Sequence, residues 1–314
     1  MTIRSTADGV LRSFAPAKLN LCLRVVGRRP DGRHLLESLF WPLAWGDELS
    51  INVGAPRSMT LAWTEDAPRT APLAVDSSNL VLRAVEAAER AGGPSAAVAL
   101  AKRLPAEAGL GGGSSDAGAV LRALCPEAGR AEAALGLGAD VPFFLDPRPG
   151  WMTGIGERRE AWDSGDLNWA FVVAVPPFPL STARVFEHFR AHGRLAAPGV
   201  RPAERPDSAS LTRFVGDHGN ALTASALVLE PRLSPILDAL RSANPLHAEM
   251  SGSGTACFAI FETLDLAKEK AQVLDAEYRT LNCKWIAAGT YRLRHDPAAF
   301  GEHHGNHRGE SLPS

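Results

Sequence analysis

The sequence predicts an α+β protein of two domains that face each other across a cleft. Its 314 residues are enough for two domains that each bury a core. The first half combines strand patterns with helices and four glycines within residues 109–113, which is typical of a loop that holds an anion. The second half alternates short strands and helices, which indicates a sheet able to pair antiparallel, with helices packed on it.

The first clear strand pattern covers residues 13–26. Side chains alternate along it between an apolar set of Leu19, Leu21, Leu23 and Val25 and a second set of Lys18, Asn20, Cys22 and Arg24. A period of two predicts a strand with one buried face. The other face then presents Lys18 and Asn20 together.

The remaining elements of the first half follow from periodicity and from glycine and proline. We expect a turn at 27–32, a second strand region at 34–53 with a break at Gly46-Asp47, loops or a short hairpin at 54–78, a helix at 79–91, a strand from Val98 to Lys102 and a small alanine-rich helix at 130–137. The strand that ends at Lys102 leads into the glycine-rich run.

The run from Pro105 to Asp116 is the most informative stretch of the chain. Apolar residues recur at helix spacing from Ala117 onward, and Pro126 ends the pattern, so the glycines lead into a helix. Glycines allow close approach to a ligand, and a helix start offers unpaired N–H groups, so the combination favours a phosphate chain. A Walker loop is disfavoured, because it requires a lysine directly after the glycines and none is present. A dinucleotide fingerprint is disfavoured as well, because Ser114 stands at its third glycine position.

The second half is predicted to alternate strands and helices. We expect a strand at 169–175, an irregular connection at 190–210, helices near 219–230 and 233–242, a glycine turn at 251–254 leading into a strand, a helix at 265–279 and a last strand at 284–293. The histidines within 301–307 could bind a metal, but a frayed terminus is the preferred interpretation.

Composition excludes several classes of protein. Hydrophobic residues make up 45% and charged residues 22%, as in a soluble globular protein. The net charge of −2 gives no electrostatic reason to expect nucleic acid or an anionic membrane as a partner. No apolar run approaches the ~18 residues of a membrane span, and the N-terminus lacks the apolar core of a signal peptide. Four widely spaced cysteines indicate reduced, mostly buried thiols, so we expect a cytoplasmic protein.

Five motifs occur in the order found in one enzyme superfamily: Ala15-Pro-Ala-Lys18-Leu-Asn20-Leu, Asp31-Gly-Arg-His34, Gly109-Leu-Gly-Gly-Gly-Ser-Ser115, Gly138-Ala-Asp140-Val-Pro and Ser251-Gly-Ser-Gly254. On these residues the chain resembles the GHMP kinase superfamily across positions 13–293. The resemblance implies a two-domain fold, with an N-terminal domain like domain 2 of ribosomal protein S5, a ferredoxin-like C-terminal domain and the active site between them. We place the domains at 1–164 and 165–298, followed by a flexible tail at 299–314.

The resemblance also implies a reaction. The opening Pro-Ala-Lys-Leu-Asn-Leu with Asp-Gly-x-His nearby is narrower than the superfamily pattern. It resembles members that use ATP and Mg²⁺ to phosphorylate the 2-hydroxyl of methylerythritol in its cytidine diphosphate derivative, a step of non-mevalonate isoprenoid synthesis. The expected partners are small molecules, with no nucleic acid and no membrane, and the expected state is a monomer or weak homodimer.

By this resemblance Asp140 accepts or orients the hydroxyl proton, and Lys18 keeps Asp140 ionised and stabilises charge on the phosphoryl group. The expected ATP-binding residues are Asn79, Leu80, Lys102, Pro105, Gly109, Leu110, Gly111, Gly112, Gly113, Ser114 and Ser115. Ser115 is also an expected contact of Mg²⁺. Structural alternatives are a helix cap for Asn79 and a strand-end charge for Lys102.

The residues expected to bind the substrate are Asn20, His34, Asp140 and Phe186. The resemblance implies that Asn20 and His34 hold the cytidine diphosphate end and that Phe186 stacks on cytosine, although Phe186 is equally well interpreted as a core residue. The chain departs from its relatives at Arg33, where many have a tyrosine as a second stacking surface. A planar guanidinium can also stack on a base. Further departures are Glu107-Ala108 before the glycines and Thr255 after the second glycine turn.

Three other functions are compatible with parts of this pattern. A GHMP kinase for another alcohol, such as homoserine or mevalonate, would share the loop but lack Lys18 and Asn20 on one strand with His34. A nucleotide-binding regulator without catalysis is disfavoured by the intact Lys18 and Asp140. A hydride-transfer enzyme is disfavoured by Ser114.

Overall fold

The computed structural model describes residues 4–5, 9–68 and 73–292, so the predicted tail at 299–314 and its histidines lie outside the described residues. The first part of the chain forms β1 (Arg4–Ser5), β2 (Val10–Arg28), β3 (His34–Val53), β4 (Ser58–Trp63), α1 (Leu80–Arg90), β5 (Ala96–Lys102), α2 (Gly112–Leu124), α3 (Glu127–Leu137), the 3-10 helix η1 (Pro142–Leu145), β6 (Gly150–Thr153) and β7 (Arg158–Arg159). The second part forms β8 (Ala170–Val175), α4 (Thr182–His192), α5 (Ser208–His218), α6 (Thr223–Leu229), α7 (Leu233–Ser242), β9 (His247–Met250), β10 (Cys257–Phe261), α8 (Leu264–Glu277), the 3-10 helix η2 (Arg279–Leu281) and β11 (Lys284–Gly289).

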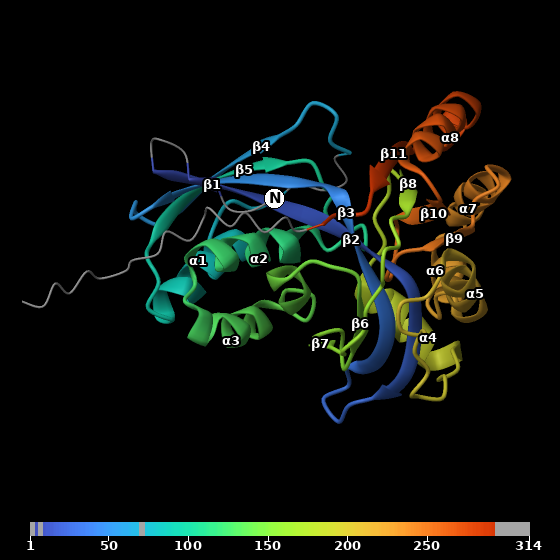
Figure 1. Cartoon of the computed structure of the whole chain (residues 1–314), viewed down its shortest axis with the longest axis horizontal. Helices are drawn as coiled ribbons and strands as arrows, with labels where there is room; N and C mark the ends of the chain where they lie inside the picture. Colours follow the sequence, from blue (N-terminus) through green and yellow to red (C-terminus); the bar gives the residue numbers. More distant parts are fainter. Residues whose placement is uncertain (1–3, 6–8, 69–72, 293–314) are drawn as a thin grey trace, which may run out of the picture.

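The first sheet has the strand order β1-β2-β3-β5-β4, and β6 and β7 extend it along the far end of β3. Only β4 and β5 pair in parallel within the described strands of this sheet. Helices α1, α2 and α3 cover one face of this sheet (Figure 1). Their apolar sides pack on Leu49 of β3 and Val98 of β5 to form one core. This arrangement holds the glycine loop, which joins β5 to α2, at one end of the sheet.

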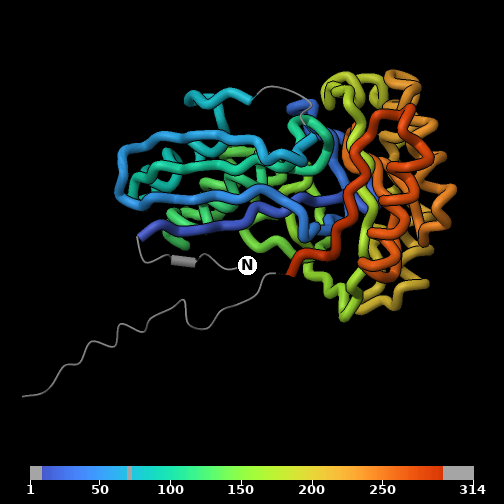
Figure 2. The backbone as a smooth tube through the Cα atoms, turned by 90° about the horizontal axis from the view of Figure 1, so that it is seen from above, coloured from blue at the N-terminus to red at the C-terminus, as the bar shows by residue number. Residues whose placement is uncertain are grey.

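The second sheet has the order β11-β8-β10-β9, with all neighbours antiparallel. Numbered along the chain this is the order 4-1-3-2 of a ferredoxin-like sheet, so the predicted α+β fold is confirmed. Helices α4, α6, α7 and α8 pack on one face, and Figure 2 shows α7 and α8 on the side away from the first sheet.

A shared apolar core joins the two sheets. Trp41 of β3 stacks on Trp169 with ring centroids 5.3 Å apart, and the same cluster contains Leu19 of β2, Phe171 of β8 and Phe258 of β10. The prediction that β2 has one buried face is therefore wrong. Residues 15–25 are buried on both faces, because α2 packs on one part of the strand and the second sheet on another, and three register shifts interrupt its alternation.

Other sequence predictions need smaller corrections. Strand β3 runs unbroken through Gly46-Asp47, because Asp47 is fully buried with polar partners described below. The segment 54–78 contains the strand β4 rather than only loops or a hairpin. Within 190–210 only 193–207 is irregular, and α4 and α5 flank it. The prolines that suggested a long connection all lie within 193–207.

The four cysteines are free and buried, as the sequence predicted. Burial raises the pKa of the Cys22 and Cys283 thiols to about 12, so both stay protonated at neutral pH. Among the described helices, none combines the length and the apolar character needed to cross a bilayer.

Candidate active site

The glycine run forms both the end of a loop and the first turn of α2. The apolar spacing begins only at Ala117, but the helix begins at Gly112, after Gly111 with a φ of 70° that glycine adopts without strain. Hydrogen bonding within the helix begins at Ser115, whose N–H donates to Gly111 O at 2.8 Å. The N–H groups before it have no acceptor inside the helix, so this turn presents donors and the positive end of the helix dipole.

Close packing explains why this loop needs glycine. A Cβ added to Gly109 would lie 2.4 Å from Ser251 O, and one added to Gly111 would lie 3.1 Å from Lys18 Cγ. The Lys18 N–H donates to Leu110 O at 2.9 Å, so β2 runs directly beside the loop. The same contacts that require glycine therefore bring Lys18 to the glycine loop.

Lys18 and Asp140 meet at the end of this loop. Lys18 Nζ lies 3.5 Å from Asp140 Oδ2, donates to Asn20 Oδ1 at 2.6 Å and lies 4.8 Å from the centre of the Phe40 ring. The Lys18 side chain is buried, whereas 31% of the Asp140 side chain is exposed. The ammonium group of Lys18 is thus held in place, while the carboxylate of Asp140 remains partly exposed.

Asn20 is held in one orientation by hydrogen bonds. Its Nδ2 donates to Ser38 Oγ at 2.9 Å, and Ser38 Oγ donates in turn to Cys22 O at 2.6 Å. Its backbone N–H donates to Ser251 Oγ at 3.1 Å. Asn20 Oδ1 is therefore presented to Lys18, so the two side chains that sequence spacing placed together do interact.

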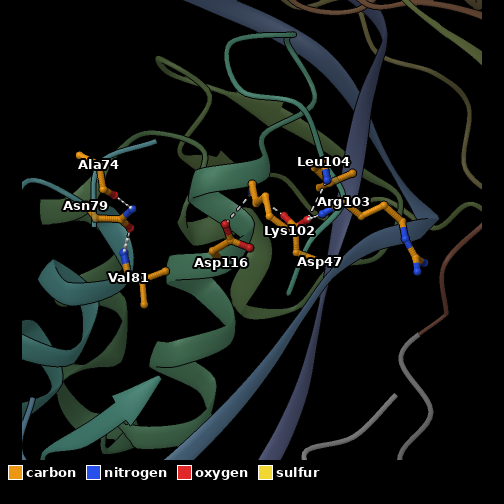
Figure 3. A network of polar contacts seen from close by, with 8 residues as sticks. All are labelled: Asp47, Ala74, Asn79, Val81, Lys102, Arg103, Leu104 and Asp116. Carbon is orange, nitrogen blue, oxygen red and sulfur yellow. Dashed lines mark hydrogen bonds and ion pairs between the residues drawn. The ribbon is translucent and has the colours of Figure 1, made fainter. Parts of the chain in front are cut away.

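A buried charge cluster lies under the first turn of α2 (Figure 3). Lys102 Nζ donates to Asp47 Oδ2 at 2.5 Å and to Asp116 Oδ2 at 2.8 Å, and Asp47 Oδ1 accepts the backbone N–H groups of Arg103 and Leu104 at 2.6 and 2.7 Å. Burial raises the pKa of Asp116 well above its usual range, against the attraction of Lys102. Burial alone would lower the pKa of Lys102, but the two carboxylates outweigh it and raise that pKa. The cluster ties β3, β5 and α2 together below the glycine loop.

A cavity of about 430 Å³ lies beside the glycine loop and contains most of the residues predicted to bind ATP. These are Asn79, Leu80, Lys102, Pro105, Gly109, Leu110, Gly111, Gly112, Gly113 and Ser114. Ser115 does not line it: its side chain is fully buried and its Oγ has no hydrogen-bond partner. Asn79 caps α1, because its Oδ1 accepts from Val81 N at 2.9 Å and its Nδ2 donates to Ala74 O at 2.6 Å (Figure 3). The side-chain contacts of Asn79 are thus those of a helix cap, and those of Lys102 are those of a charge at the end of a strand, as the structural alternatives described.

A larger cavity of about 1400 Å³ meets the first at Gly109 and Gly111 and contains the residues predicted to act on the acceptor. These are Lys18, Asn20, His34, Asp140 and Phe186. The Lys18–Asp140 pair therefore lies where a cavity lined by backbone donors adjoins one suited to a second molecule.

His34 and Phe186 form an aromatic end to the larger cavity. Their rings stack with centroids 5.0 Å apart and an interplanar angle of 23°, and the His34 ring also meets Phe189 edge-on. Phe186 is only half-buried, while Phe189 lies in the core. Burial, with the nearby charges of Arg28 and Arg190, lowers the pKa of His34 below 6.5, so its ring is neutral at pH 7. A neutral imidazole beside a phenyl ring suits an uncharged, flat ligand group.

Sequence reasoning missed several residues of the site. Thr182 Oγ1 lies 2.7 Å from Ser253 Oγ, and both line the larger cavity. Phe40, under Lys18, and the partners of Lys102 were also missed. Asp47 carried no distinctive local signal, because β3 also contains Glu37 and the exposed Glu48, and only its tertiary partners set Asp47 apart.

Comparison with known proteins agrees with this geometry. Residues 79–145 match the family model for the GHMP kinases N terminal domain, and residues 205–280 match that for GHMP kinases C terminal. The chain belongs to the GHMP kinase family.

Several relatives that are about 40% identical carry the name 4-diphosphocytidyl-2-C-methyl-D-erythritol kinase. The protein of that name from Paracoccus denitrificans is 41% identical over 280 residues, covering 89% of this chain and 96% of the relative. That from Ruegeria pomeroyi is 40% identical over 260 residues, covering 80% and 88%. A crystal structure of 4-(cytidine 5'-diphospho)-2C-methyl-D-erythritol kinase has 33% identity and a TM-score of 0.66, covering 89% of this chain and 98% of the other. Homoserine kinase from Cytophaga hutchinsonii, at 14% identity and a TM-score of 0.59, shares the fold.

Proposed function

We propose that this chain transfers the γ-phosphoryl group of ATP to the 2-hydroxyl of 4-diphosphocytidyl-2-C-methyl-D-erythritol. The names and the extensive similarity of its relatives support the reaction. The observation that carries it here is the 3.5 Å Lys18–Asp140 pair at the junction of the two cavities. As a GHMP kinase, the protein is a small-molecule kinase that uses an alcohol as acceptor.

The smaller cavity would hold ATP. Its adenosine would lie against Leu80 and Pro105, and its phosphates would follow the backbone N–H groups from Gly109 to Ser114. Lys102 would not pair with a phosphate, because its ammonium group is already shared by the carboxylates of Asp47 and Asp116. We therefore assign Lys102 to shaping the cavity.

The reacting groups would meet at Asp140. Phosphoryl transfer demands in-line positioning and charge neutralisation more than covalent work. Asp140, open to the cavity, would orient the acceptor hydroxyl and accept its proton, while Lys18 would stabilise negative charge on the transferred group. Asn20, fixed by Ser38, would hold both the Lys18 ammonium group and the acceptor in register.

Magnesium is part of the proposal. The described residues contain no group of three His, Cys, Asp or Glu side chains placed to hold an ion, so the phosphate oxygens would supply most ligands. Mg²⁺ prefers oxygen ligands, and the hydroxyl of Ser115 has no hydrogen-bond partner. Because Ser115 is fully buried and does not line the cavity, it would reach the ion only after a local rearrangement of the first turn of α2. When bound, the ion would neutralise phosphate charge during transfer.

A coupled assay with purified protein tests the proposal. Incubation with Mg-ATP and, separately, 4-diphosphocytidyl-2-C-methyl-D-erythritol, homoserine and mevalonate should give a phosphorylated product only with the first. Phosphorylation of homoserine or mevalonate instead would identify another alcohol kinase, and ATP binding without any product would favour a regulator. We expect the enzyme to act in the cytoplasm as a monomer or weak homodimer, which sedimentation at several concentrations would test.

A further inference from the structure

The larger cavity carries cationic side chains that the catalytic pair does not use. Four arginines line it: Arg29 and Arg33 at the β2–β3 turn, Arg158 at the start of β7 and Arg190 on α4. Arg29 is already paired with Asp31 at 3.2 Å. Guanidinium groups from three separate elements point to an anionic part of the ligand, since guanidinium binds phosphate through paired N–H donors. The sequence motifs assigned no role to Arg158 or Arg190, and they suggested Arg33 only as a stacking surface for the base.

The turn between β6 and β7 places Arg158 between the two ends of the cavity. Gly154 O of this turn accepts the Leu36 N–H at 2.7 Å, two residues along β3 from His34. A Cβ added to Gly156 would lie 3.5 Å from Asp140 Oδ1. The turn therefore spans the distance from the aromatic end to the reacting carboxylate, and Arg158 follows directly after it.

The guanidinium group of Arg158 is available to a ligand. Its ion pair with Glu157 is long, at 3.6 Å, and 74% of its side chain is exposed. Glu157 itself is turned inward, with 12% of its side chain exposed and its Oε2 accepting the Ile155 N–H at 2.6 Å. Glu157 thus serves the turn and leaves most donors of Arg158 unused.

Arg33 lies in a turn between β2 and β3 that three hydrogen bonds hold together. Arg29 N–H donates to Arg33 O at 2.8 Å, Gly32 N–H donates to Arg29 O at 3.0 Å, and Arg28 Nε donates to Gly32 O at 3.1 Å. Within the described residues the Arg33 side chain has no ion pair or hydrogen bond, so its charge is unmatched.

We propose that Arg158 and Arg33 bind the diphosphate of the acceptor substrate. This inference rests on the proposed function, which gives the acceptor a neutral base at one end, a hydroxyl at the other and a diphosphate between them. The neutral His34–Phe186 end suits the base and Asp140 suits the hydroxyl, and the two arginines supply positive charge to the segment between. Arg33 then contributes charge rather than a stacking surface.

The test compares an anionic with an uncharged probe. Binding of cytidine diphosphate and of cytidine is measured by calorimetry with the ATP site saturated by a non-hydrolysable ATP analogue. The variants are Arg158→Gln, Arg33→Gln and, as a matched control, Arg241→Gln, an exposed helix arginine with one ion pair at 3.2 Å outside the cavity. We expect each cavity variant to weaken cytidine diphosphate binding by ~10-fold to ~100-fold, as for loss of a charge-assisted hydrogen bond, with cytidine binding within about twofold of wild type.

The possible outcomes distinguish failure of this inference from failure of the proposed function. If both cavity variants retain the wild-type preference for cytidine diphosphate over cytidine, the diphosphate assignment is wrong for both arginines. If Arg33→Gln weakens the binding of both probes equally, the assignment is wrong for Arg33. In either case the proposed kinase function stands. If the wild-type protein binds neither probe, the proposed substrate itself is wrong and the inference falls with it. Unchanged melting temperature and KM for ATP in the variants confirm that the fold and the nucleotide site are intact.

Discussion

Replacement of Asp140 by Asn should remove the proton acceptor while leaving the architecture in place. The new side chain has the same shape and keeps an oxygen near Lys18 Nζ, which also retains its 2.6 Å hydrogen bond to Asn20 and its contact with the Phe40 ring. Because 31% of the Asp140 side chain is exposed, loss of its charge should change the stability of the fold by only about 1 kcal/mol. The catalytic effect should be much larger.

A positioned general base contributes ~10²–10⁴-fold, so kcat should fall by that factor, equivalent to about 3–5 kcal/mol in the barrier. Asp140 does not line the nucleotide cavity, so the dissociation constant of ATP should stay within a few-fold of wild type. The measurements are steady-state rates by coupled assay and nucleotide affinity by calorimetry. Asp146→Asn, which removes an exposed carboxylate paired with Arg148, is the matched control and should be nearly silent. A near-normal kcat for Asp140→Asn would refute the assignment of Asp140 as the base.

Three further predictions concern the elements around this pair. Gly112→Val should weaken ATP binding measured by calorimetry, since its Cβ would lie 3.2 Å from Lys102 Nζ and 3.3 Å from Leu104 Cβ and would displace the first turn of α2; unchanged affinity would separate that turn from the nucleotide. Asp47→Asn should lower the free energy of unfolding by about 3–5 kcal/mol in urea denaturation, as for a buried pair that loses one charge, and a loss below about 1 kcal/mol would contradict the cluster. The lowered pKa of His34 means that folding favours the neutral form of its ring. Its contribution to stability is therefore present above pH 6.5 and is lost as the pH falls below that value. His34→Gln should flatten the pH dependence of the free energy of unfolding below pH 6.5, and an unaltered pH profile would contradict this assignment.

Local sequence patterns predicted the elements whose signals are local. Helix α1 has an Asn cap, an amphipathic face and a glycine stop, and it forms within one residue of the predicted range. The glycine run was recognised, but the start of α2 was not, because glycine is a poor helix former. The close packing of Gly112 on Lys102 and Leu104, which favours glycine there, is a tertiary contact that no local pattern records. Burial of both faces of β2 was not predictable either, since it comes from packing of the second sheet, which no local period records.

The roles of the site's side chains were likewise predicted only in part. Lys18 and Asp140 lie far apart in the chain, and only the order of motifs suggested that they meet, as the structure places them. The resemblance placed Lys102 among the ATP-binding residues, and Lys102 does line the smaller cavity, but its ammonium group is committed to Asp47 and Asp116. Such a commitment depends on which strands become neighbours, so residue type and position alone could not predict it.

The glycine turn at 251–254 explains how the two cavities are held in register. Ser251 Oγ accepts the Asn20 N–H at 3.1 Å and donates to Gly109 O at 3.2 Å, so one hydroxyl joins the strand that carries Lys18 to the glycine loop. Two residues on, Ser253 Oγ lies 2.7 Å from Thr182 Oγ1 at the start of α4, the helix that carries Phe186. A shift of this turn would therefore move the nucleotide loop, the catalytic strand and the aromatic end together. The turn lies in the second half of the chain but contacts the glycine loop and β2 of the first, so the proposed transfer would depend on both halves.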